Sequence, residues 1–192
     1  MEDALNHRDF TKTRASRIRI AFWGLLRHTK LNKVIIDRLS NDERFELHYY
    51  GREQATGKIL REYVKEINAH NIYFHGEYLP IERYEFVKNT DIIHNIYHDT
   101  NMLLAMGNKY YDGIIFRIPQ ICMPNSQMAK MCYDYEIGCA IDPNKENFAD
   151  LLYSYYCQLN KFQFYKACDA ELSRVLSEYN YGCSVIKQIC NT

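Results

Sequence analysis

Features that commonly identify nucleic-acid-binding proteins are missing from this chain of 192 residues. Basic and acidic side chains number 24 each, so the formal net charge is zero at neutral pH. This balance argues against a protein that binds nucleic acid by neutralising phosphates, because no basic excess exists to release counterions. A small anionic ligand remains compatible with this balance, since it needs only a local positive site.

Membrane-spanning and disulfide-forming patterns are also missing. No apolar run approaches the roughly 20 residues that a membrane helix needs. The chain opens with polar and charged residues, so we expect no secretory signal. The seven cysteines are odd in number and form no C-x-x-C pair, which indicates reduced, buried thiols. We therefore expect a cytoplasmic protein.

The common nucleotide-binding motifs do not occur. The absence of G-x-G-x-x-G argues against an NAD site of the usual Rossmann kind, and no Walker lysine motif is present. The first expected strand ends in Ala-Phe-Trp-Gly, without the acidic residues of a phospho-receiver domain.

Strand patterns alternate with amphipathic helix patterns until the C-terminal third, which is helical. Strands are expected at 17–24, 45–50, 71–75, 91–97, 120–123 and 137–141. Helices are expected at 30–39, 56–68, 81–88, 107–116, 126–133, 145–159, 162–179 and 181–190. This order predicts an α/β fold, a Rossmann-like parallel sheet of about six strands flanked by helices, with a helical C-terminal tail. Residues 1–16 are expected to form a linker or tail, and residues 17–192 one domain.

Ligands of such sheets bind beyond the carboxyl ends of the strands. The loop after Gly24 carries Arg27 and Lys30 and opens a helix, whose free N–H groups suit a diphosphate. The alternative is that both cations are solvated surface groups. Gly76 and Glu77 follow the third strand, where a glycine lets a flat ring approach the backbone or forms a plain turn.

The loop after Tyr97 is rich in polar side chains. His98, Asp99, Thr100 and Asn101 cluster where a sugar could lie. His94 and His98 have the spacing of a helical metal pair, but in a strand they would lie about 13 Å apart. We therefore expect no metal here and interpret His94 as a core histidine.

A helix start follows at Gly107. Asn108 and Lys109 offer an amide and an ammonium, and Asp112 lies one turn further on the same face. A carboxylate there can accept both hydroxyls of a ribose while the helix start faces phosphates. The alternative is an acid that stabilises its own helix dipole.

The run Asn108–Ile121, NKYYDGIIFRIPQI, resembles the "NKLFEYLALGKPVI" segment in the C-terminal domains of many GT-B glycosyltransferases, which make bacterial surface polysaccharides. Five further stretches resemble that family in sequence order. They are Gly24 with Lys30 ("G-R-L-x-x-E-K"), 49–51 ("I-x-G"), 72–76 ("V-x-F-x-G"), 89–93 ("x-A-D-I") and 137–143 ("x-x-G-x-x-x-x-P"). The resemblance extends from about Arg17 to the C-terminus.

The resemblance implies the donor-binding half of a glycosyltransferase that uses a UDP- or GDP-sugar, without a metal or other cofactor. Lys30, Asn108 and Lys109 would contact the diphosphate, with Arg27 as a substitute cation. Asp112 takes the place of the family's ribose-binding Glu, and Gly76 and Glu77 would face the base. The acceptor would be a growing surface polysaccharide or glycolipid.

The family's N-terminal acceptor-binding domain has no counterpart in this sequence. We expect that half as a preceding domain or a separate partner chain, with peripheral contact to the inner face of the membrane through it. The usual catalytic base belongs to that half, so no catalytic residue is assigned.

Three departures from the family leave other functions open. Leu25 replaces a phosphate-binding Arg, Leu104 replaces the first Glu of an E-x7-E pattern, and Phe116-Arg117 replaces Ala-Gly before the proline. One alternative is a non-catalytic interaction module, and another is half of a nucleotide-sugar epimerase.

Overall fold

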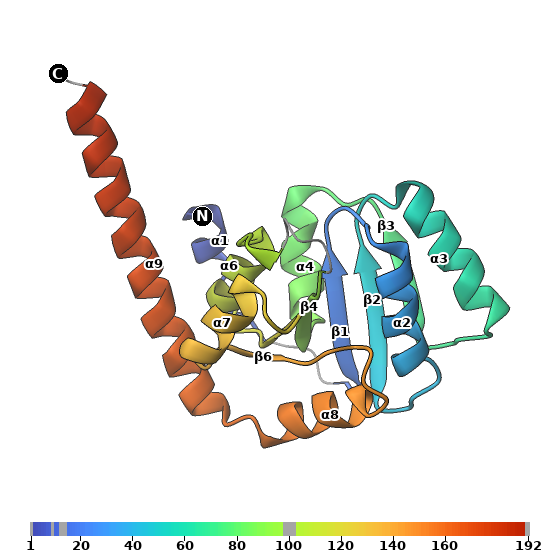
Figure 1. Cartoon of the computed structure of the whole chain (residues 1–192). Coiled ribbons are helices and arrows are strands. Elements are labelled where there is room, and N and C mark those ends of the chain that lie inside the picture. Colours follow the sequence, from blue (N-terminus) through green and yellow to red (C-terminus); the bar gives the residue numbers. More distant parts are fainter. Residues whose placement is uncertain (1, 9, 12–14, 98–102, 191–192) are drawn as a thin grey trace.

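The structure is a computed structural model that describes residues 2–8, 10–11, 15–97 and 103–190 (Figure 1). Its strands are β1 (Ile18–Trp23), β2 (Phe45–Tyr50), β3 (Ile72–Gly76), β4 (Ile92–Asn95), β5 (Gln120–Cys122) and β6 (Gly138–Ala140). Its helices are α1 (Glu2–Asn6), α2 (Thr29–Leu39), α3 (Gln54–Glu66), the 3-10 turn η1 (Pro80–Glu82), α4 (Arg83–Lys88), α6 (Asn108–Ile115), α7 (Gln127–Asp134), α8 (Phe148–Gln158) and α9 (Lys161–Cys190).

All six strands are parallel and follow the order β3-β2-β1-β4-β5-β6. The chain winds outward from β1 to β3, returns to pair β4 with the other side of β1, and continues outward to β6. The order therefore reverses between β1 and β4, where open α/β sheets form their ligand crevice. The predicted Rossmann-like fold is confirmed.

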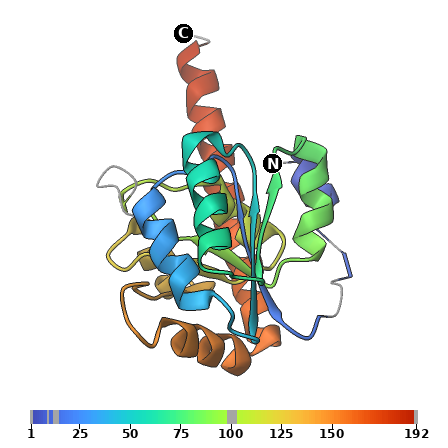
Figure 2. The same ribbon diagram turned by 90° about the vertical axis from the view of Figure 1, so that its right-hand side faces the viewer.

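Two hydrophobic layers cover the two faces of the sheet. One face of β1, with Ile20 and Phe22, packs against α2, α3 and α8. The opposite face, with Ala21 and Trp23, packs against α4, α6, α7 and α9. Figure 2 shows the sheet nearly edge-on, with α2 and α3 on one side and α4 on the other. Burial of all six β1 side chains explains why the strand reads as a continuous apolar run interrupted only by Arg19.

The expected helices at 162–179 and 181–190 are one helix, α9, so the predicted break at Asn180 is wrong. Asn180 and Gly182 lie on a part of α9 where Tyr179 and Tyr181 are exposed. Solvent-facing positions tolerate a weak helix former at a modest cost, and the helix continues through them.

The first residues, expected to lack regular structure, include the short helix α1. Its Ala4 is buried in the layer formed by α4 and α6. His7 stacks on Tyr84 with ring centroids 3.9 Å apart, and Arg8 donates to the Ile115 carbonyl oxygen. With only two apolar residues, α1 is too short to show a helical period in the sequence.

Among the described residues, no helix combines the length and the apolar character needed to cross a membrane.

Candidate functional site

The carboxyl edge of the sheet brings the predicted binding loops together. Because the strands are parallel, α2, α3, α6 and α7 all begin at this edge. The first two loops touch backbone to backbone, since a Cβ on Gly51 would lie 2.0 Å from the Gly24 carbonyl oxygen. Gly51 has a φ of +130° and Gly24 a φ of +124°, which side chains rarely adopt. Glycine at position 51 therefore permits the close approach of these loops.

Two shallow hollows lie beyond the ends of β1, β2 and β3. One, of about 290 Å³, is lined by Gly24, Leu25, Gly51, Arg52, Gln54, Glu77 and Tyr78. The other, of about 430 Å³, is lined by Gly51, Arg52, Glu53, Gln54, Lys58, Gly76 and Glu77. Arg52 pairs with Glu77 at 3.0 Å, and both side chains are exposed. The two residues predicted to face the base, Gly76 and Glu77, thus lie beside the first loop.

A buried amide fixes the shape of the first loop. Asn32 Nδ2 donates to the carbonyl oxygens of Arg27 and His28 at 2.6 and 3.2 Å. Its Oδ1 accepts a 3.0 Å hydrogen bond from the buried hydroxyl of Tyr49. His28, directly before α2, takes a left-handed conformation with a φ of 59°. The loop backbone is therefore held in place.

The two predicted cations of this loop, Arg27 and Lys30, are exposed at the start of α2. No acidic residue occupies the first turn of that helix. Its positive dipole end is therefore accessible to an anion.

The start of α6 separates residues that the sequence placed on one face. Asn108 is exposed, and the N-cap residue of α6, Gly107, provides no side-chain hydrogen bond to the helix start. Lys109 is buried, with its ammonium 4.2 Å from the centre of the Phe22 ring and hydrogen-bonded to the Tyr97 hydroxyl. Burial lowers the pKa of Lys109 to about 7. In this conformation the ammonium faces an aromatic cage.

Asp112 is also turned inward. Its carboxylate accepts a 2.9 Å hydrogen bond from the Trp23 indole and pairs with Arg83 at 3.3 Å. Burial raises the pKa of Asp112, and the Arg83 guanidinium opposes that shift. Only 6% of the side chain is exposed. A ribose could reach this carboxylate only if one of these contacts opened.

Sequence reasoning did not identify Trp23, Arg83 and Tyr97 as partners of these two residues. Trp23 alone gave a local signal, since an indole N–H directly before the first glycine loop requires an acceptor when it is buried.

His94 is confirmed as a core histidine. It is 2% exposed, and its Nδ1 accepts the Ile96 amide at 3.1 Å. Burial lowers the pKa of His94 to about 3, with Lys109 contributing, so the ring is neutral. Among the described residues no group of three His, Cys, Asp or Glu side chains is placed to hold a metal.

The predicted sugar-facing residues His98, Asp99, Thr100 and Asn101 lie outside the described residues. Leu104, which replaces a Glu of the family pattern, is 80% exposed close to them in sequence.

No family model matches the sequence, and no curated protein matches it. Solved structures do match its fold. The C-terminal domain of a group 1 glycosyltransferase (LpcC) from Francisella tularensis has a TM-score of 0.62 and 17% identity, covering 90% of this chain and 97% of that domain. HepE of Anabaena, solved with UDP and glucose, has a TM-score of 0.74 and 13% identity, covering 95% of this chain and 54% of HepE.

The lipopolysaccharide outer core galactosyltransferase WaaB has a TM-score of 0.62 and 14% identity, with coverages of 93% and 51%. The chain thus spans about half the length of HepE and WaaB. At these identities the likeness concerns the fold. This chain has the fold of the C-terminal domain of GT-B glycosyltransferases.

Proposed function

We propose that this chain is the donor-binding half of a glycosyltransferase and binds a UDP- or GDP-sugar at the carboxyl edge of its sheet. The observation that carries the proposal is that the α2 start with its two exposed cations lies at the same edge of the sheet as the two hollows. HepE, which has the same fold, was solved with UDP and with UDP-glucose.

In this proposal the diphosphate lies between the starts of α2 and α6. Arg27 and Lys30 supply positive charge, and the backbone N–H groups at Asn108 supply neutral donors. These groups stabilise a leaving diphosphate without a metal ion. The base lies in the hollow at Gly76 and Glu77, where the exposed Arg52–Glu77 pair can open at little cost.

In the ligand-free chain, Lys109 and Asp112 stabilise the structure around the proposed site. Their buried contacts with Tyr97 and Trp23 anchor α6 to the rest of the edge. Lys109 can contact phosphate, and Asp112 can contact ribose, only in a ligand-bound state in which Tyr97 and Trp23 move away.

The proposal includes an acceptor-binding half, either as a further domain or as a separate chain. The exposed end of α9 supports this part of the proposal. This helix of 30 residues is roughly 45 Å long. Its first half is buried through Phe164, Cys168 and Leu172, while its last turns extend beyond the domain (Figure 1). Tyr181, Ile186 and Ile189 are each more than 60% exposed there, as expected of a helix that packs against a further protein surface.

We further propose that the complete enzyme extends a surface polysaccharide or glycolipid in the cytoplasm, at the inner face of the membrane. The support is the nature of the matched enzymes, WaaB among them.

A non-catalytic interaction module is the second candidate. The buried partners of Lys109 and Asp112 and the exposed Leu104 favour it, because they leave fewer polar groups for a sugar. This candidate predicts no nucleotide binding.

The test is a titration of the ¹⁵N-labelled chain with UDP, UDP-glucose and GDP. The donor-binding proposal expects saturable shifts of amides at Gly24–Lys30, Gly76–Glu77 and Gly107–Lys109. Lys30→Glu should weaken binding about tenfold or more, the loss of one charge-assisted hydrogen bond. Lys65→Glu, the same change in the last turn of α3 and exposed, is the matched control. Absence of saturable shifts with all three ligands would overturn the proposal in favour of the interaction module.

A further inference from the structure

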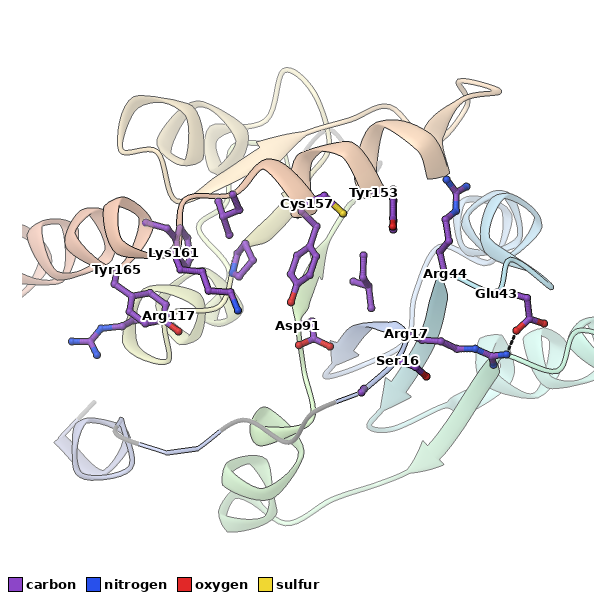
Figure 3. A pocket seen from close by; sticks show the side chains of 16 residues that line it. Ser16, Arg17, Glu43, Arg44, Asp91, Arg117, Tyr153, Cys157, Lys161 and Tyr165 are labelled. Atoms are coloured by element: carbon purple, nitrogen blue, oxygen red, sulfur yellow. Dashed lines mark hydrogen bonds and ion pairs between the residues drawn. The ribbon is translucent and has the colours of Figure 1, made fainter.

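A further cavity lies at the amino edge of the sheet, opposite the proposed donor site. Its volume is about 570 Å³, within the range of small-molecule pockets. It opens between α8, the start of α9 and the residues that precede β1, β2, β4 and β5 (Figure 3). The proposed function does not use it.

Aromatic side chains from two helices form one wall of this cavity. Tyr153 and Tyr156 come from α8, and Phe164 and Tyr165 come from α9. Burial raises the pKa of Tyr156, and so does the negative charge of Asp91, so its hydroxyl stays protonated. Rings with hydroxyl groups suit a flat ligand that also carries polar atoms.

Basic side chains outnumber acidic ones in the lining of the cavity. Four cations line the cavity: Arg17, Arg44, Arg117 and Lys161. The two acids that line it, Glu43 and Asp91, are both neutralised. Asp91 is held by Arg19 at 2.9 Å, and Glu43 pairs with Arg17.

The remaining arginines have partners outside the cavity lining. Arg44 pairs with Asp42 at 2.6 Å and Asp150 at 2.8 Å, and Arg117 pairs with Asp169 at 3.0 Å. Lys161 differs from them. Within the described part of the chain its ammonium has no hydrogen bond or ion pair, and Figure 3 shows its side chain reaching into the cavity.

Lys161 also lies at the start of α9, where the helix dipole is positive. It is the first residue of α9, whose first turn contains no acidic residue. Asn160 Oδ1 accepts the Gln163 amide at 3.2 Å, as an N-cap does. A cation at the positive end of a helix dipole is unfavourable unless an anion lies nearby. Lys161 is exposed, so its ammonium is accessible to an anion that enters the cavity.

We propose that this cavity binds an anionic group carried on a flat aromatic ring, such as an aryl phosphate. Lys161 binds the anion, and the ring lies against the tyrosines of α8 and α9. Cations alone would suit any phosphate, but a cavity of this volume with an aromatic wall favours a ligand with a ring.

The probe for the test is 1-naphthyl phosphate, titrated into the ¹⁵N-labelled full chain and compared with inorganic phosphate. Saturable shifts are expected at Arg117, Cys157 and Lys161, with at least tenfold weaker binding of inorganic phosphate. Lys161→Glu should weaken binding of the probe at least tenfold. The same variant should raise the melting temperature of the free protein, because an acid replaces a cation at the helix start. This rise would show that lost binding is not lost folding.

Lys166→Glu is the matched control, since it makes the same charge change at an exposed position of α9 outside the cavity lining. It should leave binding of the probe unchanged. The proposal is overturned if 1-naphthyl phosphate produces no saturable shifts at this cavity, or if Lys161→Glu binds it as tightly as the wild type. Shifts are assigned residue by residue, so failure of UDP to bind at the opposite edge does not affect this outcome.

Discussion

The indole N–H of Trp23 donates a 2.9 Å hydrogen bond to the carboxylate of Asp112, 89 residues further along the chain. Trp23 ends β1 and Asp112 lies one turn into α6, so this bond fixes α6 at the point where the strand order reverses. Arg83, on α4, approaches the same carboxylate at 3.3 Å. Three elements around the candidate site thus share one buried acid.

Removal of that acid should destabilise the fold. Asp112→Ala leaves the Trp23 indole without an acceptor and Arg83 without its anion, and we expect a loss of roughly 2–4 kcal/mol. Asp112→Asn keeps an acceptor for the indole and should lose roughly half as much. Urea unfolding measures both. Glu178→Gln is the control, because Glu178 pairs with Arg174 but is 66% exposed. It should change stability by less than about 0.5 kcal/mol. Equal stability of Asp112→Ala and the wild type would contradict the shared role of this carboxylate.

The buried ammonium of Lys109 should make stability depend on pH. Its pKa is about 7 in the fold, against an ordinary 10.5 in the unfolded chain. Between these values the unfolded chain binds more protons, so stability rises as pH increases through this window. The slope for one group is at most about 1.4 kcal/mol per pH unit. Urea unfolding at pH 7.0, 7.75 and 8.5 should show the rise in the wild type.

Lys109→Met supplies the comparison, because it keeps an apolar chain in the aromatic cage and removes the titrating group. Its stability should be higher than that of the wild type at pH 7, with the difference shrinking towards pH 8.5. Burial raises the pKa of Cys139, and its unfolded thiol begins to ionise near the top of this range, which acts in the opposite direction. The difference between wild type and variant isolates Lys109 from that effect. A difference that does not change with pH would refute a neutralised lysine.

The fold could be predicted because its signals are local. Strand and helix periods alternate along the chain, and a parallel sheet follows from that order. The inward face of α6 could not be predicted in the same way. Spacing places Lys109 and Asp112 near one another on a helix, but their partners Tyr97 and Trp23 decide that this face is buried. The length of α9 shows a similar limit, since Asn180 and Gly182 resemble a break but lie on an exposed part of the helix.

The cavity at the amino edge had no sequence signal. Its lining comes from the segment before β1, from residues that precede three other strands and from two helices. No periodic pattern or short motif joins such distant residues, so only the folded chain brings Lys161 near Arg117 and Tyr153.

Glycine at position 51 should be required for the contact between the first two loops. Gly51→Ala places a Cβ 2.0 Å from the Gly24 carbonyl oxygen at a φ of +130°. Strain at such a position costs roughly 1–3 kcal/mol, and the displaced loops should also weaken the proposed binding of UDP. Gly182→Ala, in the interior of α9, meets nothing within 4 Å and should stabilise by roughly 0.5–1 kcal/mol. Thermal unfolding of the two variants should therefore shift in opposite directions, and a common direction would argue against the close approach.

The exposed end of α9 should contribute to association with a partner and little to the stability of this chain. Ile186 and Ile189 are 62% and 69% exposed, so Ile186→Ser with Ile189→Ser removes few intramolecular contacts. We expect a stability change within about 0.5 kcal/mol for each substitution. Leu172→Ala, in the buried half of the same helix, should cost roughly 2–5 kcal/mol because it opens a cavity.

Chemical denaturation measures the stability of both variants, and Leu172→Ala should lose clearly more stability than the double serine variant. Binding of the proposed acceptor-binding half, supplied as a separate chain, should be weakened by the double serine variant, since buried isoleucines at an interface contribute apolar area. A double variant that unfolds as readily as Leu172→Ala would mean that the end of α9 stabilises this domain itself. In that case its apolar side chains would no longer support a partner.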